Sequence, residues 1–111
     1  MTKVLISGCN GHMGKVVADI CAEDPDIEVV GGFDLLGTTD RPFPVFSSPA
    51  QFDGQADALI DFSSPAALEG LLELGKSKKI PLVLATTGYS EEQIAQINDC
   101  AQSVPIFRSA N

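Results

Sequence analysis

Strand-like and helix-like patterns alternate along this sequence from one end to the other. Five apolar runs have the composition of buried strands. They lie at residues 3–7, 27–34, 58–62 and 104–107 and within 80–88, which indicates a strand followed by a turn. Three helical patterns separate most of them, at about residues 12–23, 65–76 and 90–101. Such alternation predicts an α/β fold, in which a parallel sheet carries helices on both faces. Because crossovers between parallel strands are right-handed, we expect a doubly wound sheet.

Local signals refine this outline. Each of the first two helices is expected to bury one apolar face. In the first helix this face consists of Met13, Val16, Val17, Ile20 and Cys21. In the second helix it consists of Leu68, Leu71 and Leu72. Ser90 and Gln93 form a capping box at the start of the third helix. Residues 35–57 contain Gly, Thr and Pro and should be mostly loop, with room for a short strand at Val45–Phe46.

Composition and charge narrow the function classes. The 111 residues make one domain's worth of chain, 44% of them hydrophobic and 20% charged. A formal net charge of -8 argues against a nucleic-acid-binding surface, which needs basic residues. No apolar run approaches the roughly 20 residues that span a bilayer, and no secretory signal is evident, so no membrane partner is expected. The three cysteines, without a C-x-x-C pair, favour a cytoplasmic protein with no metal site or disulfide framework.

The stretch "SGCNGHMG" holds three glycines at regular spacing, between the first strand and the first helix. In a phosphate-binding loop, Gly8 would make the tight turn, Gly11 would let a pyrophosphate approach the backbone, and Gly14 would let the helix pack on the strand. The N–H groups at the helix start would meet the negative charge. The alternative is a tight turn that binds no ligand.

An acid stands where such a site needs one. Asp34 ends the second strand, 20 residues after Gly14, where a carboxylate would accept hydrogen bonds from the adenosine ribose. A carboxylate there also repels a 2′-phosphate and so favours NADH over NADPH, although His12 and Lys15 could compensate. The alternative is a solvated Asp at the end of a strand.

Other polar residues follow the remaining strands. Thr86 and Thr87 could line a nicotinamide or substrate site, or simply cap a turn. Ser63 and Ser64 allow the same two interpretations, and His12 in a first helical turn is more often solvated than catalytic. The sequence shows no acid–base pair, no Ser/His/Asp set and no metal cluster, so no catalytic or metal-binding residue is predicted. Because ligands bind outside the carboxyl ends of parallel strands, all these residues should share one rim.

Four segments together resemble a known family. "ISGCNGHMGK", "ALIDFSSP", "LATTGYSEEQ" and the terminal "SAN" fall in the order and spacing of 4-hydroxy-tetrahydrodipicolinate reductase, also called dihydrodipicolinate reductase. The resemblance runs over nearly the whole chain. It implies a Rossmann-type domain that binds NADH or NADPH, in an oxidoreductase that reduces an intermediate of diaminopimelate and lysine biosynthesis.

The resemblance also implies roles for individual residues. The pyrophosphate would be wrapped by Gly8, Cys9, Asn10, Gly11, His12 and Met13, and the adenine ribose would be held by Asp34. The cofactor would be bordered by Phe62 and Ser63, its nicotinamide side by Ala85, Thr86 and Thr87, with Ser109, Ala110 and Asn111 closing over it. Ala85 stands where the family usually has Gly. Leu35 stands where some members carry an Arg for the 2′-phosphate, which supports NADH as the preferred cofactor with NADPH possible.

Length is the main departure from the family. In the family, a domain that binds the substrate and forms the tetramer follows the "SAN" segment, and it carries paired histidines and a lysine for catalysis. We therefore expect residues 1–111 to be a truncated dinucleotide-binding domain with little or no reductase activity alone. A dicarboxylate substrate and a homotetramer are expected of the complete enzyme. Two alternatives are a non-catalytic module that senses nicotinamide nucleotides, and another two-domain dehydrogenase of amino-acid metabolism.

Overall fold

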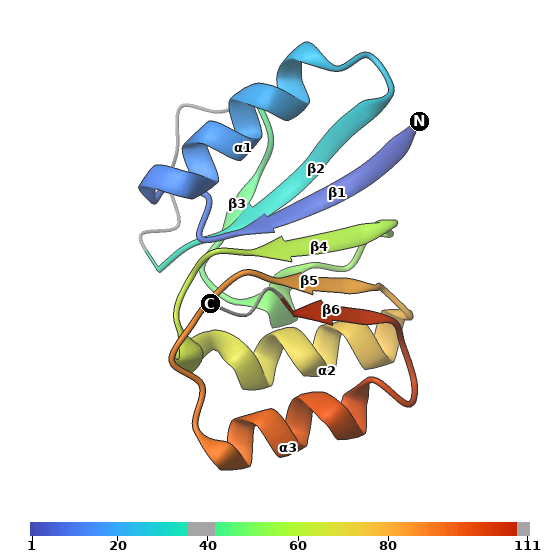
Figure 1. Ribbon diagram of the computed structural model, residues 1–111. Coiled ribbons are helices and arrows are strands. Elements are labelled where there is room, and N and C mark those ends of the chain that lie inside the picture. The colour runs from blue at the N-terminus through green and yellow to red at the C-terminus, as the bar shows by residue number, and fades with distance from the viewer. Residues whose placement is uncertain (36–41, 109–111) are drawn as a thin grey trace.

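The computed structural model describes residues 1–35 and 42–108 (Figure 1). The strands are β1 (Thr2–Ser7), β2 (Ile27–Phe33), β3 (Val45–Phe46), β4 (Ala58–Asp61), β5 (Leu82–Leu84) and β6 (Ile106–Arg108). The helices are α1 (His12–Glu23), α2 (Leu68–Lys78) and α3 (Glu91–Cys100), with short 3-10 helices η1 (Pro49–Gln51) and η2 (Pro65–Ala67). The expected strand at Val45–Phe46 is present.

All pairings in the sheet are parallel, and the strand order is β3-β2-β1-β4-β5-β6. The chain moves outward from β1 to β3, then returns to the other side of β1 and continues outward to β6. Figure 1 shows α1 on one face of the sheet and α2 and α3 on the other. The doubly wound parallel sheet is therefore confirmed, and its direction reverses between β1 and β4.

The larger part of the core lies between the sheet and the α2 and α3 helices. The predicted buried face of the second helix is confirmed, since Leu68, Leu71 and Leu72 are at most 7% exposed. They pack with strand residues such as Leu5 and Leu59, neither of which is exposed at all. This packed side gives the carboxyl ends of the strands a rigid support.

The predicted buried face of the first helix is wrong at three positions. Met13, Val16 and Ile20 are 49%, 39% and 61% exposed. Instead α1 packs through small residues, with Gly14, Ala18 and Cys21 buried. A Cβ on Gly14 would lie 2.1 Å from the Gly8 carbonyl oxygen, so the helix approaches the loop more closely than any side chain allows. That approach turns the larger apolar residues outward.

The start of α3 agrees with the sequence prediction, and the start of α2 differs from it. The capping box of α3 is confirmed: the Gln93 N–H donates to Ser90 Oγ at 3.2 Å, and the Ser90 N–H donates to Gln93 Oε1 at 2.9 Å. At Pro65 the chain first forms η2, and α2 begins only at Leu68. Among the described residues, no helix is long and apolar enough to cross a membrane.

Candidate functional site

Two neighbouring cavities, of about 400 and 340 Å³, lie where the strands end. Both are bordered by Gly11 of the glycine loop and by Phe62, Ser63 and Ser64, which follow β4. The first extends towards Asp34 at the end of β2, and the second towards Thr86 after β5. We call the two together the strand-end crevice. It spans the point where the winding of the sheet reverses, which is where ligands of such sheets bind.

Most of the predicted site residues border this crevice. The first cavity is lined by Gly8, Gly11, Asp34, Phe62 and Ser63 among them, and the second by Gly11, His12, Met13, Phe62, Ser63, Ala85, Thr86 and Thr87. Neither cavity is lined by Cys9 or Asn10. The predicted contacts of Ser109, Ala110 and Asn111 lie outside the described residues.

Two of the three loop glycines are required by the protein's own packing. Gly8 has φ +82°, and an added Cβ would lie 3.0 Å from backbone atoms of Phe62 and Ser63. Gly14 has no room for a Cβ beneath the carbonyl of Gly8. Both therefore hold α1, β1 and the turn after β4 in close contact.

Gly11 is different, because nothing in the described chain fills the space beside it. It has an ordinary φ of -79°, and a Cβ there would meet only the Gly8 carbonyl oxygen, at 3.4 Å. It is the N-cap of α1, and as a glycine it has no side chain with which to cap the N–H groups of the helix start. An open space beside a glycine N-cap, at the N-terminus of a helix, fits an anionic group such as a phosphate.

Asp34 is joined to the glycine loop. The N–H of Asn10 donates to Asp34 Oδ2 at 3.0 Å, and the N–H of Asp34 itself donates to the Phe46 carbonyl oxygen at 3.0 Å. The carboxylate is half-buried beside the first cavity. It is thus held next to the loop, in a position to accept hydrogen bonds from a ligand's hydroxyl groups.

The side chain of Cys9 points away from the crevice. Cys9 is fully buried in a small cluster with Ile6, Ala18 and Phe43. A Cβ on Gly32 would lie 2.6 Å from its sulfur, so the thiol packs directly on β2. Only the backbone of Cys9 is therefore left to contact a ligand.

A buried carboxylate that the sequence analysis did not single out organises the second half of the crevice. Asp61, at the end of β4, is fully buried. Its Oδ1 accepts hydrogen bonds from the Ser63 N–H at 2.9 Å and from Ser63 Oγ at 2.5 Å. Its Oδ2 accepts from Thr86 Oγ1 at 3.0 Å, and Ser7 Oγ donates to Ser63 Oγ at 3.3 Å. The signal was available, because this acid ends an apolar run just as Asp34 does.

Tyr89 lies close to this group of hydrogen bonds without joining it. Its hydroxyl is buried and makes no hydrogen bond within the described part of the chain. Burial raises the pKa of Tyr89, the negative charge of Asp61 raises it further, and Thr86 and Arg108 act in the opposite direction. The loop after β5 is also tied to η2, because Gln93 Nε2 donates to the Pro65 carbonyl oxygen at 2.8 Å.

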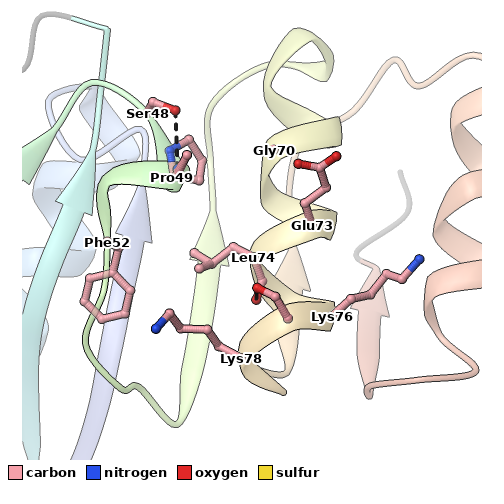
Figure 2. Close-up of a pocket in the computed structure, with 10 residues that line it drawn as sticks. Ser48, Pro49, Phe52, Gly70, Glu73, Leu74, Lys76 and Lys78 are labelled. Carbon is pink, nitrogen blue, oxygen red and sulfur yellow. Dashed lines mark hydrogen bonds between the residues drawn. The ribbon is translucent and has the colours of Figure 1, made fainter.

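A larger cavity, of about 720 Å³, lies elsewhere, between η1 and α2. Figure 2 shows its labelled side chains, with Lys76 and Lys78 extending in different directions from α2. It contains none of the residues that the sequence indicated, and its polar groups do not converge on one point. Size alone therefore does not make it the functional site, and the chemistry favours the strand-end crevice.

Comparison with known families and proteins shows what this chain is similar to. Residues 2–111 match the sequence model of a family described as "Dihydrodipicolinate reductase, N-terminus". A 4-hydroxy-tetrahydrodipicolinate reductase of Caldanaerobacter subterraneus is 45% identical over 111 residues, which are 100% of this chain and 44% of that protein. The corresponding protein of Clostridium tetani is 40% identical with the same coverage. The chain thus spans less than half the length of these curated relatives.

Solved structures show the same fold. A dipicolinate-bound dihydrodipicolinate reductase from Paenisporosarcina sp. TG-14 superimposes with a TM-score of 0.79 at 21% identity, over 100% of this chain and 48% of that one. A scyllo-inositol dehydrogenase from Lactobacillus casei gives 0.78 at 14% identity, over 98% of this chain and 36% of that one. At these identities the likeness concerns the fold alone.

Proposed function

Since this chain belongs to the dihydrodipicolinate reductase family, as its N-terminal domain, we propose that its strand-end crevice binds NADH with the pyrophosphate over Gly11. The bound nicotinamide supplies a hydride, and the complete enzyme uses it to reduce 4-hydroxy-tetrahydrodipicolinate in diaminopimelate and lysine biosynthesis. This chain's own part is to bind and orient the dinucleotide.

The observation that carries the proposal is the contrast between Gly11 and its two partner glycines. The fold explains why positions 8 and 14 hold no side chain, but it gives no such reason at position 11. A pyrophosphate against the backbone supplies that reason, because a methyl group there would take the place of its oxygens. The start of α1, with glycine as its N-cap, adds N–H groups and a positive dipole end for the charge.

The two cavities suit the two ends of the dinucleotide. The cavity beside Asp34 would take the adenosine half, with the carboxylate accepting hydrogen bonds from the ribose hydroxyls. The cavity beside Ala85, Thr86 and Thr87 would take the nicotinamide half. Because Asp34 is held in place by the Asn10 N–H, it would repel a 2′-phosphate, so NADH should bind more tightly than NADPH.

The remaining features of the whole protein are also part of this proposal. A second domain would bind the dicarboxylate substrate and form a homotetramer, since the curated relatives are more than twice as long as this chain. The three cysteines are buried and form no disulfide within the described residues, which fits a reducing compartment, and we place the protein in the cytoplasm.

Parallel equilibrium titrations of this chain with NADH and NADPH, followed by nicotinamide fluorescence or heat, test the proposal. We expect saturable binding, with NADH tighter. Gly11→Ala should weaken NADH binding about tenfold or more, because its methyl group occupies the pyrophosphate position. Gly70→Ala is the matched control, since Gly70 borders neither cavity of the crevice and its Cβ would meet only Pro49, at an ordinary contact distance of 3.4 Å or beyond. Equal affinities for NADH in both variants would contradict the proposed pyrophosphate position.

A further inference from the structure

The buried carboxylate of Asp61 fixes which way two hydroxyl groups of the crevice donate. A carboxylate only accepts hydrogen bonds, and a hydroxyl group has a single proton to donate. Thr86 Oγ1 gives its proton to Asp61 Oδ2 at 3.0 Å, and Ser63 Oγ gives its proton to Asp61 Oδ1. Ser63 Oγ also accepts from Ser7 Oγ at 3.3 Å. The oxygen of Thr86 is therefore left with lone pairs and no proton for a ligand.

Thr86 lies where this polarity matters. It is 8% exposed and borders the smaller cavity with Ala85 and Thr87. Asp61 has no exposed surface, so it touches no ligand and acts only through the side chains around it. Within residues 1–35 and 42–108, hydrogen bonds from Ser63 and Thr86, rather than a basic side chain, satisfy its carboxylate.

We propose that Asp61 is a positioning residue that makes Thr86 a hydrogen-bond acceptor, so that the nicotinamide end of the crevice selects a ligand group that donates. On the proposed function, on which this inference rests, that group is the carboxamide N–H₂ of the nicotinamide. A ring that carries a methyl ketone in place of the carboxamide keeps the carbonyl group and loses the donor. The site should therefore discriminate between these two rings although their shapes are similar.

Asp61→Asn should reverse the polarity of Thr86. The amide oxygen of the substituted side chain would face Ser63, which offers two donors, one of them a backbone N–H that cannot turn away. The new amide N–H₂ would then face Thr86 and donate to it. The hydroxyl group of Thr86 would rotate, so that its proton no longer donates to the side chain at position 61. The variant changes one polar atom and keeps the shape of the side chain.

The test compares NADH with reduced 3-acetylpyridine adenine dinucleotide, by equilibrium titration of this chain. For the unmodified chain we expect NADH to bind about five- to tenfold more tightly, the value of one net hydrogen bond. In Asp61→Asn and in Thr86→Val the ratio should fall to about one. Thr86→Ser keeps the hydroxyl and should keep the ratio. Unchanged ratios in Asp61→Asn and Thr86→Val would overturn the inference.

A third ligand separates this inference from the function on which it rests. ADP-ribose carries the pyrophosphate and adenosine but no nicotinamide ring, so its affinity should be the same in all four proteins. A loss of ADP-ribose binding in Asp61→Asn would mean a structural defect and would contradict the positioning role. If the unmodified chain bound neither ADP-ribose nor NADH, the proposed function itself would fail. Thr86→Val removes no buried charge, so it tests the inference even if Asp61→Asn does not fold.

Discussion

The two halves of the strand-end crevice present different chemical groups to a ligand. The half that extends towards β2 combines the backbone of Gly8 and Gly11 with one polar side chain, the Asp34 carboxylate, which accepts from a backbone N–H. The half between β4 and β5 is made of side chains: a fully buried Asp61 with hydroxyl groups directed at it. The first half should be sensitive to added atoms, and the second to the loss of polar ones.

On the proposed function, the difference follows from what each half would recognise. A pyrophosphate needs close access to N–H groups, and the least bulky backbone provides it. A nicotinamide ring offers a few directional groups, and side chains of fixed polarity recognise those best. The four substitutions below test this division, beginning with the largest expected effect.

Gly14→Ala should damage the backbone half most. The new Cβ would lie 2.1 Å from the Gly8 carbonyl oxygen, and neither backbone segment can move without separating α1 from β1. We expect a loss of about 3 kcal/mol or more in the free energy of unfolding, despite the better helix propensity of alanine. Urea denaturation measures it. Gly11→Ala is the comparison within the same loop and should cost less than about 1 kcal/mol, so equal losses would contradict the distinction between these glycines.

Asp61→Ala should damage the side-chain half by about 2–3 kcal/mol. The change leaves the buried hydroxyl group of Thr86 and the two donors of the more exposed Ser63 without their acceptor, and it opens a small void. Thermal or urea unfolding gives the value. Asp57→Ala is the matched control, since that aspartate accepts one exposed hydrogen bond from the Lys3 N–H at 2.8 Å. A loss at position 61 no larger than at position 57 would show that the carboxylate does not organise this half.

Ser7→Ala removes the one donor of the same group that bonds to Ser63 and not to Asp61. Ser7 is 2% exposed and donates to Ser63 Oγ at 3.3 Å, while Ser63 keeps its bonds to Asp61. We therefore expect a cost of about 1 kcal/mol or less in unfolding free energy. A loss as large as that of Asp61→Ala would mean that Ser7, rather than the carboxylate, is the centre of the group.

Tyr89→Phe should have the smallest effect at neutral pH, within about 0.5 kcal/mol, because the hydroxyl it removes has no partner among the described residues. The two proteins should differ at high pH. Burial raises the pKa of Tyr89 above its ordinary value of 10.0, so the unfolded chain loses the phenolic proton first. The unmodified protein should then lose stability as the pH rises through 10 towards the raised pKa, and Tyr89→Phe should lose less. If both proteins lost the same stability as the pH rises, the phenol of Tyr89 would have to be exposed to water in the folded protein.

The sequence was sufficient for features that depend on local pattern. The strands and the capping box at Ser90 both follow from short stretches of chain. It misled where distance in space decides. The outward turn of Met13 and Ile20 follows from how closely Gly14 approaches Gly8, and amphipathic spacing contains no such information.

Asp61 escaped notice for a related reason. Its importance depends on Thr86, which is 25 residues away in sequence and becomes its neighbour only when β4 and β5 pair. Its burial depends on the whole sheet. An acid at the end of an apolar run looks the same in sequence whether it faces a ligand, as we propose for Asp34, or supports the residues that do.

The position of β1 at the centre of the sheet has a consequence for the order of folding. Among the strands of this sheet β1 is synthesised first, and it needs partners on both sides: it pairs with β2 at Ile27–Phe33 and with β4 at Ala58–Asp61. Until β4 has been synthesised, one edge of β1 presents unpaired N–H and C=O groups to any passing strand. Contacts of such long sequence separation form slowly, so the nascent chain is open to misassembly during that interval. The segment that carries the glycine loop is therefore synthesised early, but the strand pairing beside it is completed late.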